Sequence, residues 1–316
     1  MSKTLGMDFG TTNSGAAFHD GNQVHMIDLG SGRLQMPSVV ALPPGTDPLL
    51  GRAALRYLER EKDPQFVYRS IKRKLGQRYI EGEDDGFQIV PDKEGFQAFS
   101  GPDESTLAPE ALAALIMARL RRAAEEQTGE TFTSVMVGVP YAAGPDQIAM
   151  TRLAASMAGF EEVSICTEPE AACYAHELDR VSQLNRALVY DQGGGTTDVA
   201  LLHCKDGYFE RKAGKGHPHL GGLDWDQQII DVVSERYRDR TGRDIREARS
   251  VMLKIGPAAE AAKIELSEFD TAPIQVPRAT LDFETGDMVD HNEMLASAEF
   301  AGRCAQLMAE RRPLIA

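Results

Sequence analysis

The chain has 316 residues, of which 42% are hydrophobic and 26% charged, so it is long enough for two domains with a large core. Its net charge of −14 argues against general nucleic-acid binding, which depends on Lys and Arg contacts to phosphates. It contains no apolar run of membrane-spanning length, no signal peptide and no CxxC pair among its four cysteines, so we expect a cytoplasmic protein without membrane or nucleic-acid partners.

The first part of the chain begins with a predicted strand over residues 3–9. Two more strands are predicted in "SGAAFHDGNQVHMIDL", around a turn at Asp20-Gly21. Residues 39–103 are rich in Pro, Gly and charge with weak periodicity, which indicates an inserted subdomain. A helix is predicted over 109–127, with Pro109 in its first turn and Gly129 after its end.

The middle of the chain alternates between strands and helices. This alternation predicts an open, largely parallel α/β sheet. The predicted elements are strand 133–139, helix 145–158, strand 162–166, helix 168–180 and strand 187–191.

The last part of the chain is predicted to contain a second, mostly helical insertion over residues 221–300, with a hairpin near "DFETGDMV", and a final helix over 293–311. Together the patterns predict two lobes. Lobe I covers 1–185, with a core of 1–38 and 104–185 around the insertion 39–103. Lobe II covers 186–316, with a core of 186–220 and 301–316 around the insertion 221–300.

Two segments of the chain share one order of parts. Asp8-Phe9-Gly10-Thr11-Thr12-Asn13 leads into "GAAF" and the Asp20-Gly21 turn, and "DQGGGTTD" (191–198) leads into "VALL" and a turn at 206–207. The second copy reads as the first with two additional glycines. The repeat predicts two related lobes whose hairpins meet at a cleft; the alternative is two unrelated hairpins with similar turns.

The residue types at these turns suit a polyphosphate and a metal ion. Glycine lets the backbone approach a phosphate closely, successive backbone N–H groups can bind an anion, and Thr hydroxyls add donors. Asp8 and Asp191, one from each lobe, could hold Mg²⁺ through its water molecules. Neither a G-x-x-x-x-G-K-[ST] loop nor a G-x-G-x-x-G turn before a helix is present in the chain.

Seven stretches, in this order, resemble the nucleotide-binding domain of the DnaK-type heat shock protein 70 family. They are "GMDFGTTNS", "IKRKLG", "VGVPYAAGPDQ", "TEPEAACYAHELD", "VYDQGGGTTDV", "HPHLGGLDWD" and "AEAAKIELS". The family belongs to the actin, hexokinase and DnaK superfamily. The resemblance implies an α/β, two-lobed actin-like ATPase fold, built from duplicated ribonuclease H-like domains with inserted subdomains, and ATP or ADP with Mg²⁺ as cofactors.

Position by position, the resemblance implies a role for each matched residue. The implied first phosphate loop is Gly10, Thr11, Thr12 and Asn13, and the second is Gly194, Gly195 and Thr196, with Gly222 also on the nucleotide. Asp8 and Asp191 surround the magnesium waters. Lys72 positions the attacking water, and Glu168, Thr196 and Asp198 complete the catalytic groups around the γ-phosphate. Glu260, Lys263 and Ser267 cover the nucleoside.

Several of these residues also have plainer interpretations. Lys72 could belong to a solvated charge run in "IKRKLG", and Glu260 with Lys263 could form an ordinary exposed helix pair. Thr167 and Glu170 fit a capping box, which leaves only Glu168 of that motif for function. His217 and His219 lie in a loop without further ligands, so we do not expect a metal there.

The chain also departs from the family pattern. Ile264 follows Lys263 where the family has an arginine, so stacking of a guanidinium on the base is not expected there. The strand, Gly-rich turn and helix that complete the second lobe in the family, and the linker and peptide-binding domain beyond them, do not follow the final helix. In this the chain resembles the divergent DnaK-like proteins without an evident peptide-binding domain. We expect an apparently incomplete lobe II, completed by a missing C-terminal segment or another protein chain.

The function that these patterns favour is a slow ATP-hydrolysing switch domain of a chaperone-like protein, with nucleotide and a co-chaperone or exchange factor as partners. A regulatory or scaffold protein that binds nucleotide with little turnover is the alternative. A small-molecule kinase of the same superfamily is a third hypothesis, but the chain has no sugar-type signature.

Overall fold

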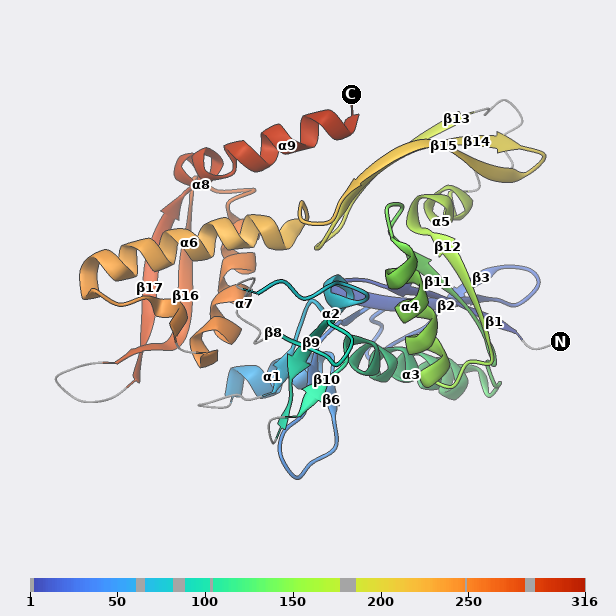
Figure 1. Cartoon of the computed structure of the whole chain (residues 1–316), viewed down its shortest axis with the longest axis horizontal. Coiled ribbons are helices and arrows are strands. Elements are labelled where there is room, and N and C mark those ends of the chain that lie inside the picture. The colour runs from blue at the N-terminus through green and yellow to red at the C-terminus, as the bar shows by residue number, and fades with distance from the viewer. Residues whose placement is uncertain are drawn as a thin grey trace.

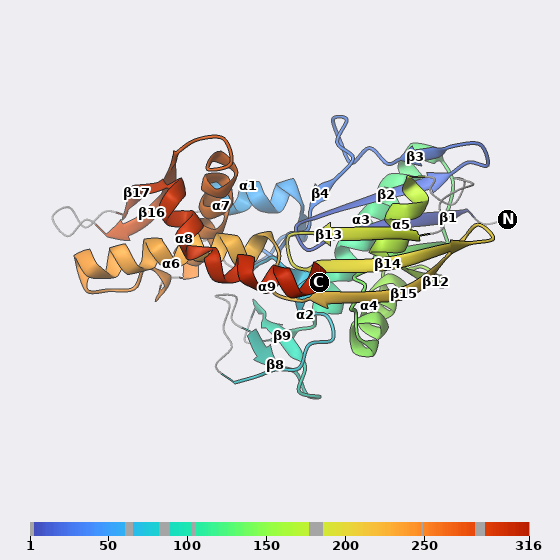
Figure 2. The same ribbon diagram turned by 90° about the horizontal axis from the view of Figure 1, so that it is seen from above.

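The computed structural model describes residues 3–60, 66–81, 89–102, 105–176, 186–247, 249–281 and 288–315. The chain has a mixed α/β architecture, with one sheet and its helices on one side and a helix-rich part on the other (Figure 1). A second, three-stranded sheet extends above the first (Figures 1 and 2). The expected α/β class and the repeated sheet unit are confirmed.

The first sheet has the strand order β12-β11-β1-β2-β3, and β4 pairs with β2. Its strands are β1 Thr4–Phe9, β2 Asn13–His19, β3 Val24–Met26, β4 Met36–Pro37, β11 Ser134–Val139 and β12 Glu162–Thr167. Only β1, β11 and β12 run parallel, and β2, β3 and β4 pair antiparallel. The prediction of a largely parallel sheet was wrong in this respect, because short hairpins return the chain antiparallel to β1.

Three helices accompany this sheet: α3 Pro109–Thr128, α4 Pro145–Met157 and α5 Glu168–Ala175. The main core packs strand residues such as Leu5 and Val137 against Leu112 and Ile116 of α3. Gly129 ends α3 with a φ of 70°, a backbone conformation that glycine adopts without strain. Helices 109–127 and 145–158 are therefore confirmed. Helix α5 is shorter than predicted, and residues 177–180 of the predicted range lie outside the described residues.

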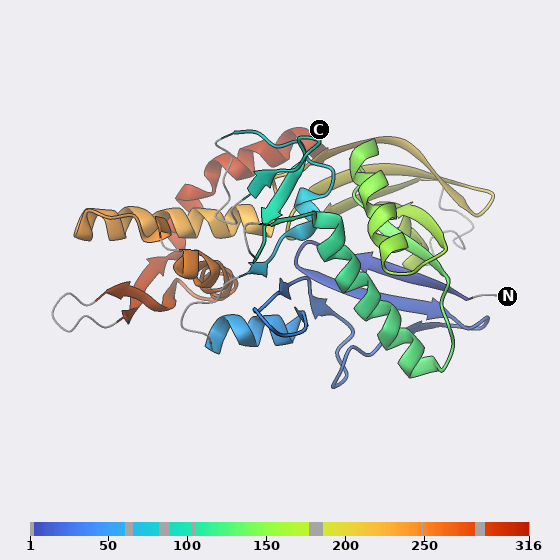
Figure 3. The ribbon, with the colours of Figure 1, turned by 60° about the horizontal axis from the view of Figure 1, so that its bottom comes forward.

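The segment predicted as an insertion over 39–103 contains short elements: β5 Val40–Ala41, β6 Leu49–Leu50, α1 Arg52–Arg60, β7 Val67–Tyr68, α2 Ile71–Lys74, β8 Ile89–Pro91 and β9 Gln97–Ser100, to which β10 Thr106–Leu107 adds. Strands β5, β6 and β7 form one small sheet, and β8, β9 and β10 form another. Apolar residues from α1 and β5 pack with Leu253 of α7 (Arg249–Glu265), and α1 lies beside α7 in Figure 3. The exact lobe and subdomain boundaries stay a prediction.

The second sheet is an antiparallel meander of β13 Arg186–Gln192, β14 Thr197–Lys205 and β15 Tyr208–His217. Asp206 and Gly207 join β14 to β15 with φ values of 52° and 81°, which is the hairpin turn that an Asp-Gly pair favours. Cys173 of α5 is buried with Ala200 and Leu202 of β14, so α5 packs against both sheets of the molecule.

The remaining elements are α6 Gly222–Thr241, η3 Ile245–Glu247, α7, β16 Thr271–Leu281, β17 Met288–Ala296, α8 Ser297–Arg303 and α9 Ala305–Ile315. The predicted hairpin is present but much longer than "DFETGDMV", whose central residues 282–287 lie outside the described part. The prediction of a final helix over 293–311 was wrong in two respects: the helix begins later, and it is divided into two helices. Residues 293–296 belong to β17, because Leu295 alternates with exposed neighbours and is buried opposite Ala272, and the helix is interrupted at Cys304.

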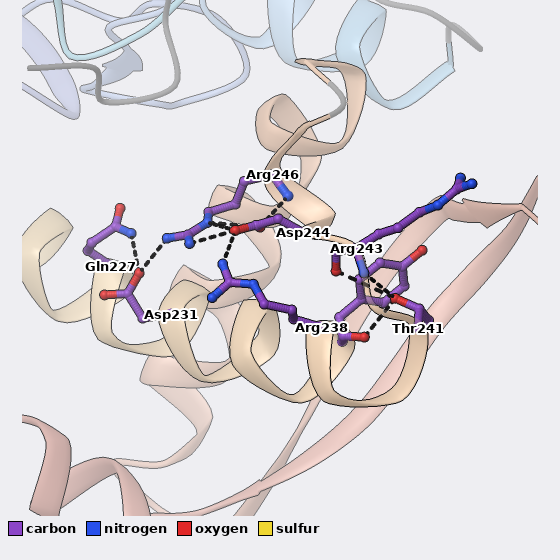
Figure 4. Close-up of polar contacts among 8 residues, drawn as sticks. Gln227, Asp231, Arg238, Thr241, Arg243, Asp244 and Arg246 are labelled. Atoms are coloured by element: carbon purple, nitrogen blue, oxygen red, sulfur yellow. Dashed lines mark hydrogen bonds and ion pairs between the residues drawn. The ribbon is translucent and has the colours of Figure 1, made fainter. Parts of the chain in front are cut away.

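Ion pairs connect α6 to the short η3 turn (Figure 4). The Asp244 carboxylate accepts hydrogen bonds from Arg246 Nε at 3.0 Å and from Arg238, and Arg246 Nη1 reaches Asp231 at 3.1 Å. These contacts hold residues 244–246 against α6. In the described part of the chain, no helix has the length and apolar content needed to cross a bilayer.

Candidate functional site

The first glycine-threonine loop, residues 10–13, connects β1 to β2. Asp8 lies one residue before the end of β1 and pairs with Gly15 in the ladder, so its side chain is held next to the loop. A Cβ atom at Gly10 would lie 2.1 Å from the Asn13 carbonyl oxygen, so only glycine fits there. The loop therefore needs its glycine for its shape.

The second loop, residues 193–196, connects β13 to β14 in the same way. Asp191 pairs with Asp198 seven positions later, as Asp8 pairs with Gly15. Both loops therefore have the same length, and Thr196 occupies the place of Asn13. The expectation that the second copy carries two additional glycines was wrong, because strand register and not the order of letters defines the repeat.

The two loops meet. A Cβ atom at Gly194 would lie 2.1 Å from Thr12 Oγ1, and one at Gly195 would lie 2.6 Å from Thr11 Oγ1. Glycine is required at both positions because the threonines of the other loop fill the space. The start of α6 supports the second loop: the amide of Gly222 donates to Gly193 O at 3.0 Å, and that of Leu223 to Gly194 O at 2.8 Å.

Charged side chains gather where strands β1, β11 and β12 end at the same edge of the first sheet. Lys72 of α2 is buried and forms an ion pair with Glu168, the first residue of α5. Loss of solvent raises the pKa of Asp8, an effect that Lys72 opposes and Glu168 reinforces. Loss of solvent likewise raises the pKa of Asp191, with Glu168 and Asp8 adding to the shift. These four side chains are thus one interacting group, and Lys72 is not part of a solvated charge run.

Asp198 is the buried carboxylate of the site, with 1% of its surface exposed. One carboxylate oxygen accepts a hydrogen bond from the Ala142 amide at 3.2 Å, across from the other lobe. The other oxygen has no hydrogen-bond partner among the described residues. Burial raises the pKa of Asp198 to about 6, although the Ala142 bond opposes the shift. A proton could therefore enter or leave this carboxylate near neutral pH.

The carboxylates of the site indicate whether it could accept a magnesium ion. Within the described residues, no group of three or more His, Cys, Asp or Glu side chains lies close enough to hold a metal directly. The charged forms of Asp8 and Asp191 are instead disfavoured by loss of solvent and by nearby carboxylates. A cation would relieve that repulsion, and Mg²⁺ commonly keeps several waters and takes only one or two carboxylates. The two residues fit such an ion.

Of the residues expected to cover the nucleoside, Glu260 and Lys263 lie on α7, and Lys263 faces α6. Lys263 Nζ pairs with Asp226 at 2.7 Å and donates to Gly222 O at 3.0 Å, while Glu260 lies 3.9 Å from Arg69. Glu260 and Lys263 therefore do not form the exposed helix ion pair that was the alternative interpretation of these residues. Ser267 lies in the turn that follows α7, is exposed, and donates its hydroxyl to Lys263 O at 3.3 Å.

A cavity of about 220 Å³ adjoins Thr196 and Asp198, and Arg73, His217 and His219 also line it. Arg73 was not identified from the sequence as part of the site. Its Nη2 atom donates to both Asp224 oxygens, at 2.9 and 2.7 Å, and to Pro218 O at 3.2 Å, so it joins α2 to the start of α6. In the sequence, the only signal that Arg73 belongs to the site was its position next to Lys72.

Comparisons with known proteins agree with this geometry. The family described as "Hsp70 protein" matches residues 4–314. The chain is 36% identical over 289 residues to "Chaperone protein DnaK" of Akkermansia muciniphila, covering 89% of this chain and 44% of that protein. It is 36% identical over 321 aligned positions to "Chaperone protein DnaK 1" of a Synechococcus species, covering 99% of this chain and 42% of that protein. The chain thus spans less than half the length of these curated relatives. It belongs to the Hsp70 family, in which it matches the DnaK-type nucleotide-binding domain.

Proposed function

We propose that the chain binds ATP and ADP with Mg²⁺ and hydrolyses ATP by attack of water on the γ-phosphate. The observation that carries the proposal is the meeting of two loops of equal length, each preceded by an aspartate, beside the Lys72–Glu168 pair. Phosphoryl transfer of this kind needs positioning and charge neutralisation more than covalent chemistry by the protein. Both requirements are met by the residues of this site.

The proposed roles are those that the family resemblance implies, and the positions of the residues support them. The amides and hydroxyls of the loops 10–13 and 194–196 hold the phosphates, and Gly222, Glu260, Lys263 and Ser267 lie toward the nucleoside. Asp8 and Asp191 would hold the magnesium ion, which when bound would supply positive charge to the phosphate oxygens. Lys72 steadies the γ-phosphate and the attacking water. Asp198 or Glu168 accepts the proton of that water.

Asp198 is the stronger candidate for the proton acceptor. Glu168 is already bound to Lys72, whereas Asp198 has a buried oxygen without a partner among the described residues and a pKa of about 6. A base with a pKa near the working pH transfers protons efficiently. Thr196, which ends the second loop, lines the same cavity as Asp198 and could align the same water.

In the cell, we propose a role as the nucleotide switch of a DnaK-like molecular chaperone in the cytoplasm, with a co-chaperone or exchange factor as partner. The relatives named above are chaperones, which supports this role. We also propose that a further segment or another protein chain completes the second lobe. Strand β13 is the edge of its sheet among the described residues, whereas its counterpart β1 pairs on that side with β11.

The test is ATP turnover by the chain and by Lys72→Ala and Thr196→Ala. Removing one group that stabilises the developing charge typically costs about 100-fold or more in turnover. We expect losses of this order in phosphate release, with ATP binding measured by calorimetry largely kept. Lys74→Ala is the matched control, because it removes a neighbouring charge from the same helix at a position to which no role in the site is assigned.

Unchanged turnover in both variants would contradict the assigned roles. Tight binding of ATP and ADP without turnover in the unmodified chain would favour the alternative of a regulatory or scaffold protein. Formation of a phosphorylated small molecule in place of free phosphate would favour a kinase.

A further inference from the structure

Ser38, which follows β4, contacts the first phosphate loop from behind. Its amide donates to Thr12 O at 2.8 Å, and its hydroxyl donates to Gly10 O at 2.8 Å. Ser38 is 1% exposed and belongs to none of the motifs discussed above. One residue therefore binds two alternate carbonyl groups of a four-residue loop.

These two bonds determine where the loop's amide groups point. In a planar trans peptide, the N–H of one residue points opposite to the carbonyl of the residue before it. No cis peptide bond is found in the described part of the chain. Because the Gly10 and Thr12 carbonyls face Ser38, the Thr11 and Asn13 amides must point away from it. Those are two of the donors that an anion-binding loop needs.

The direction of the hydroxyl bonds can be worked out. Ser14 Oγ lies 2.8 Å from Ser38 Oγ, and both side chains are buried. A hydroxyl has one hydrogen to donate, and Ser38 uses its own on Gly10 O. Ser14 must then donate to Ser38, which gives a chain from Ser14 through Ser38 to Gly10. Ser38 is the member that touches the loop carbonyl.

The second loop is held by a different device with the same result. The first amides of α6, from Gly222 and Leu223, bind the carbonyls of Gly193 and Gly194, which turns the next amides away from α6. Thr197, at the ladder position of Ser14, donates its buried hydroxyl to Leu220 O at 2.5 Å, next to that helix start. In the first lobe, the end of β4 lies behind the loop where the second lobe has the start of α6. Ser38 alone therefore takes the place of the helix amides.

We infer that Ser38 is a positioning residue of the phosphate site, which aims the Thr11 and Asn13 amides at the polyphosphate of the bound nucleotide. This inference rests on the proposed function. It predicts that Ser38 contributes to the binding of the phosphate groups and does not contribute to the binding of the nucleoside. A residue that only packed the core would affect both through stability.

The experiment measures the dissociation constants of magnesium ATP, magnesium tripolyphosphate and adenosine by calorimetry for the full chain and for Ser38→Ala and Ser14→Ala. The two variants are matched, because each removes one buried hydroxyl from the same hydrogen-bonded pair. Losing one oriented hydrogen bond is expected to weaken ATP and tripolyphosphate binding about tenfold in Ser38→Ala. Adenosine binding should be unchanged, and Ser14→Ala should bind all three ligands within about twofold of the unmodified chain. Thermal unfolding reports the stability of each variant.

Equal weakening in the two variants, or equal weakening for adenosine and ATP, would overturn the inference. If Ser38→Ala does not fold, Ser38→Thr, which keeps the hydroxyl, and Ser38→Cys, which replaces it with a weak donor, take its place. The threonine variant should bind tripolyphosphate like the unmodified chain and the cysteine variant more weakly, and the reverse order or equal binding would count against the inference. Failure of the unmodified chain to bind ATP would instead contradict the proposed function.

Discussion

At the scale of single residues, the position of the Asp198 side chain explains its raised pKa. It lies in β14 of the second sheet, and it accepts the Ala142 amide from the first lobe. A Cβ atom at Gly216 would lie 2.3 Å from Asp198 Oδ1 and 2.5 Å from the Ala142 side chain. The carboxylate is therefore enclosed by both lobes, which explains why burial dominates its pKa shift.

This shift predicts the pH dependence of ATP turnover. A carboxylate that accepts a proton works only when it is ionised, so turnover should rise with pH through about 6, the pKa of Asp198, and level off above it. Well below that pH, turnover should fall about tenfold per pH unit. The measurement is the rate of phosphate release at saturating magnesium ATP between about pH 5 and 8.

Asp198→Asn supplies the comparison for this pH profile. The variant should be slow and should lose the inflection near pH 6, because its side chain does not titrate. A wild-type profile without an inflection, or a variant that keeps it, would assign the proton transfer to another group such as Glu168.

At the scale of elements, the sequence predicted the parts whose signals are local. Pro109 and Gly129 bracket α3, and the Asp-Gly pairs mark two hairpin turns. The equal length of the two phosphate loops could not be obtained in this way. The similar letters "GTT" suggested one alignment, whereas the strand ladders, which depend on pairing between distant residues, define another.

The chain near residue 293 shows a second limit of local signals. "NEMLA" is compatible with a helix by its residue types, and a helix was predicted there. Its conformation is decided by β16, since Leu295 becomes buried only when the segment pairs as a strand beside Ala272. Tertiary pairing of this kind overrides local propensity.

The link between α6 and η3 gives a prediction at this scale (Figure 4). Asp244 accepts the Arg246 amide at 2.9 Å as well as the side chains of Arg246 and Arg238. Asp244→Ala removes a cap and partly exposed ion pairs, and should lower the free energy of unfolding by about 1 kcal/mol. Urea unfolding measures the loss, and Asp239→Ala, at an exposed aspartate of α6, is the control.

The pH dependence of this contribution has a definite sign. The Arg246 side chain holds the pKa of Asp244 below its ordinary value. A group with a lowered folded-state pKa stabilises the fold above its unfolded pKa of about 4 and loses that contribution as the pH falls further. The two variants should therefore differ in stability at neutral pH and converge in acid. A difference that persists in acid would mean that the alanine acts through packing.

At the scale of the whole molecule, the candidate site is also where the two sides of the chain touch. The two phosphate loops meet there, Ala142 binds Asp198, and Arg73 binds Asp224. These contacts join residues far apart in the sequence, so their partners could not be paired from sequence alone. The residue types were predictable from the family resemblance, but the cross-lobe bonds were not. A ligand bound between the loops would contact both sides of the molecule at once, so we predict that its binding is coupled to the contacts between them.

Arg73 gives the test of this coupling. Its side chain and that of Asp224 are mostly buried, and the pair spans from α2 to the start of α6, whose amides support the second loop. Arg73→Ala should loosen this support and speed the dissociation of bound ADP about tenfold, the order expected when one hydrogen bond to a charged group is lost. The single tryptophan, Trp225, follows Asp224 directly and provides a fluorescence signal for the measurement.

A double-mutant cycle separates the pair from the cost of each residue. Asp224 also accepts the Gly221 amide at 2.7 Å, so Asp224→Ala removes a helix cap in addition to the ion pair. If the ion pair couples the lobes, Arg73→Ala should have little further effect on ADP dissociation in the Asp224→Ala background, because its partner is already absent. Additive effects would mean that Arg73 acts through the cavity beside Thr196 and not through α6. Because the cycle compares rates for the same nucleotide, it distinguishes these two routes even if both variants lose some stability.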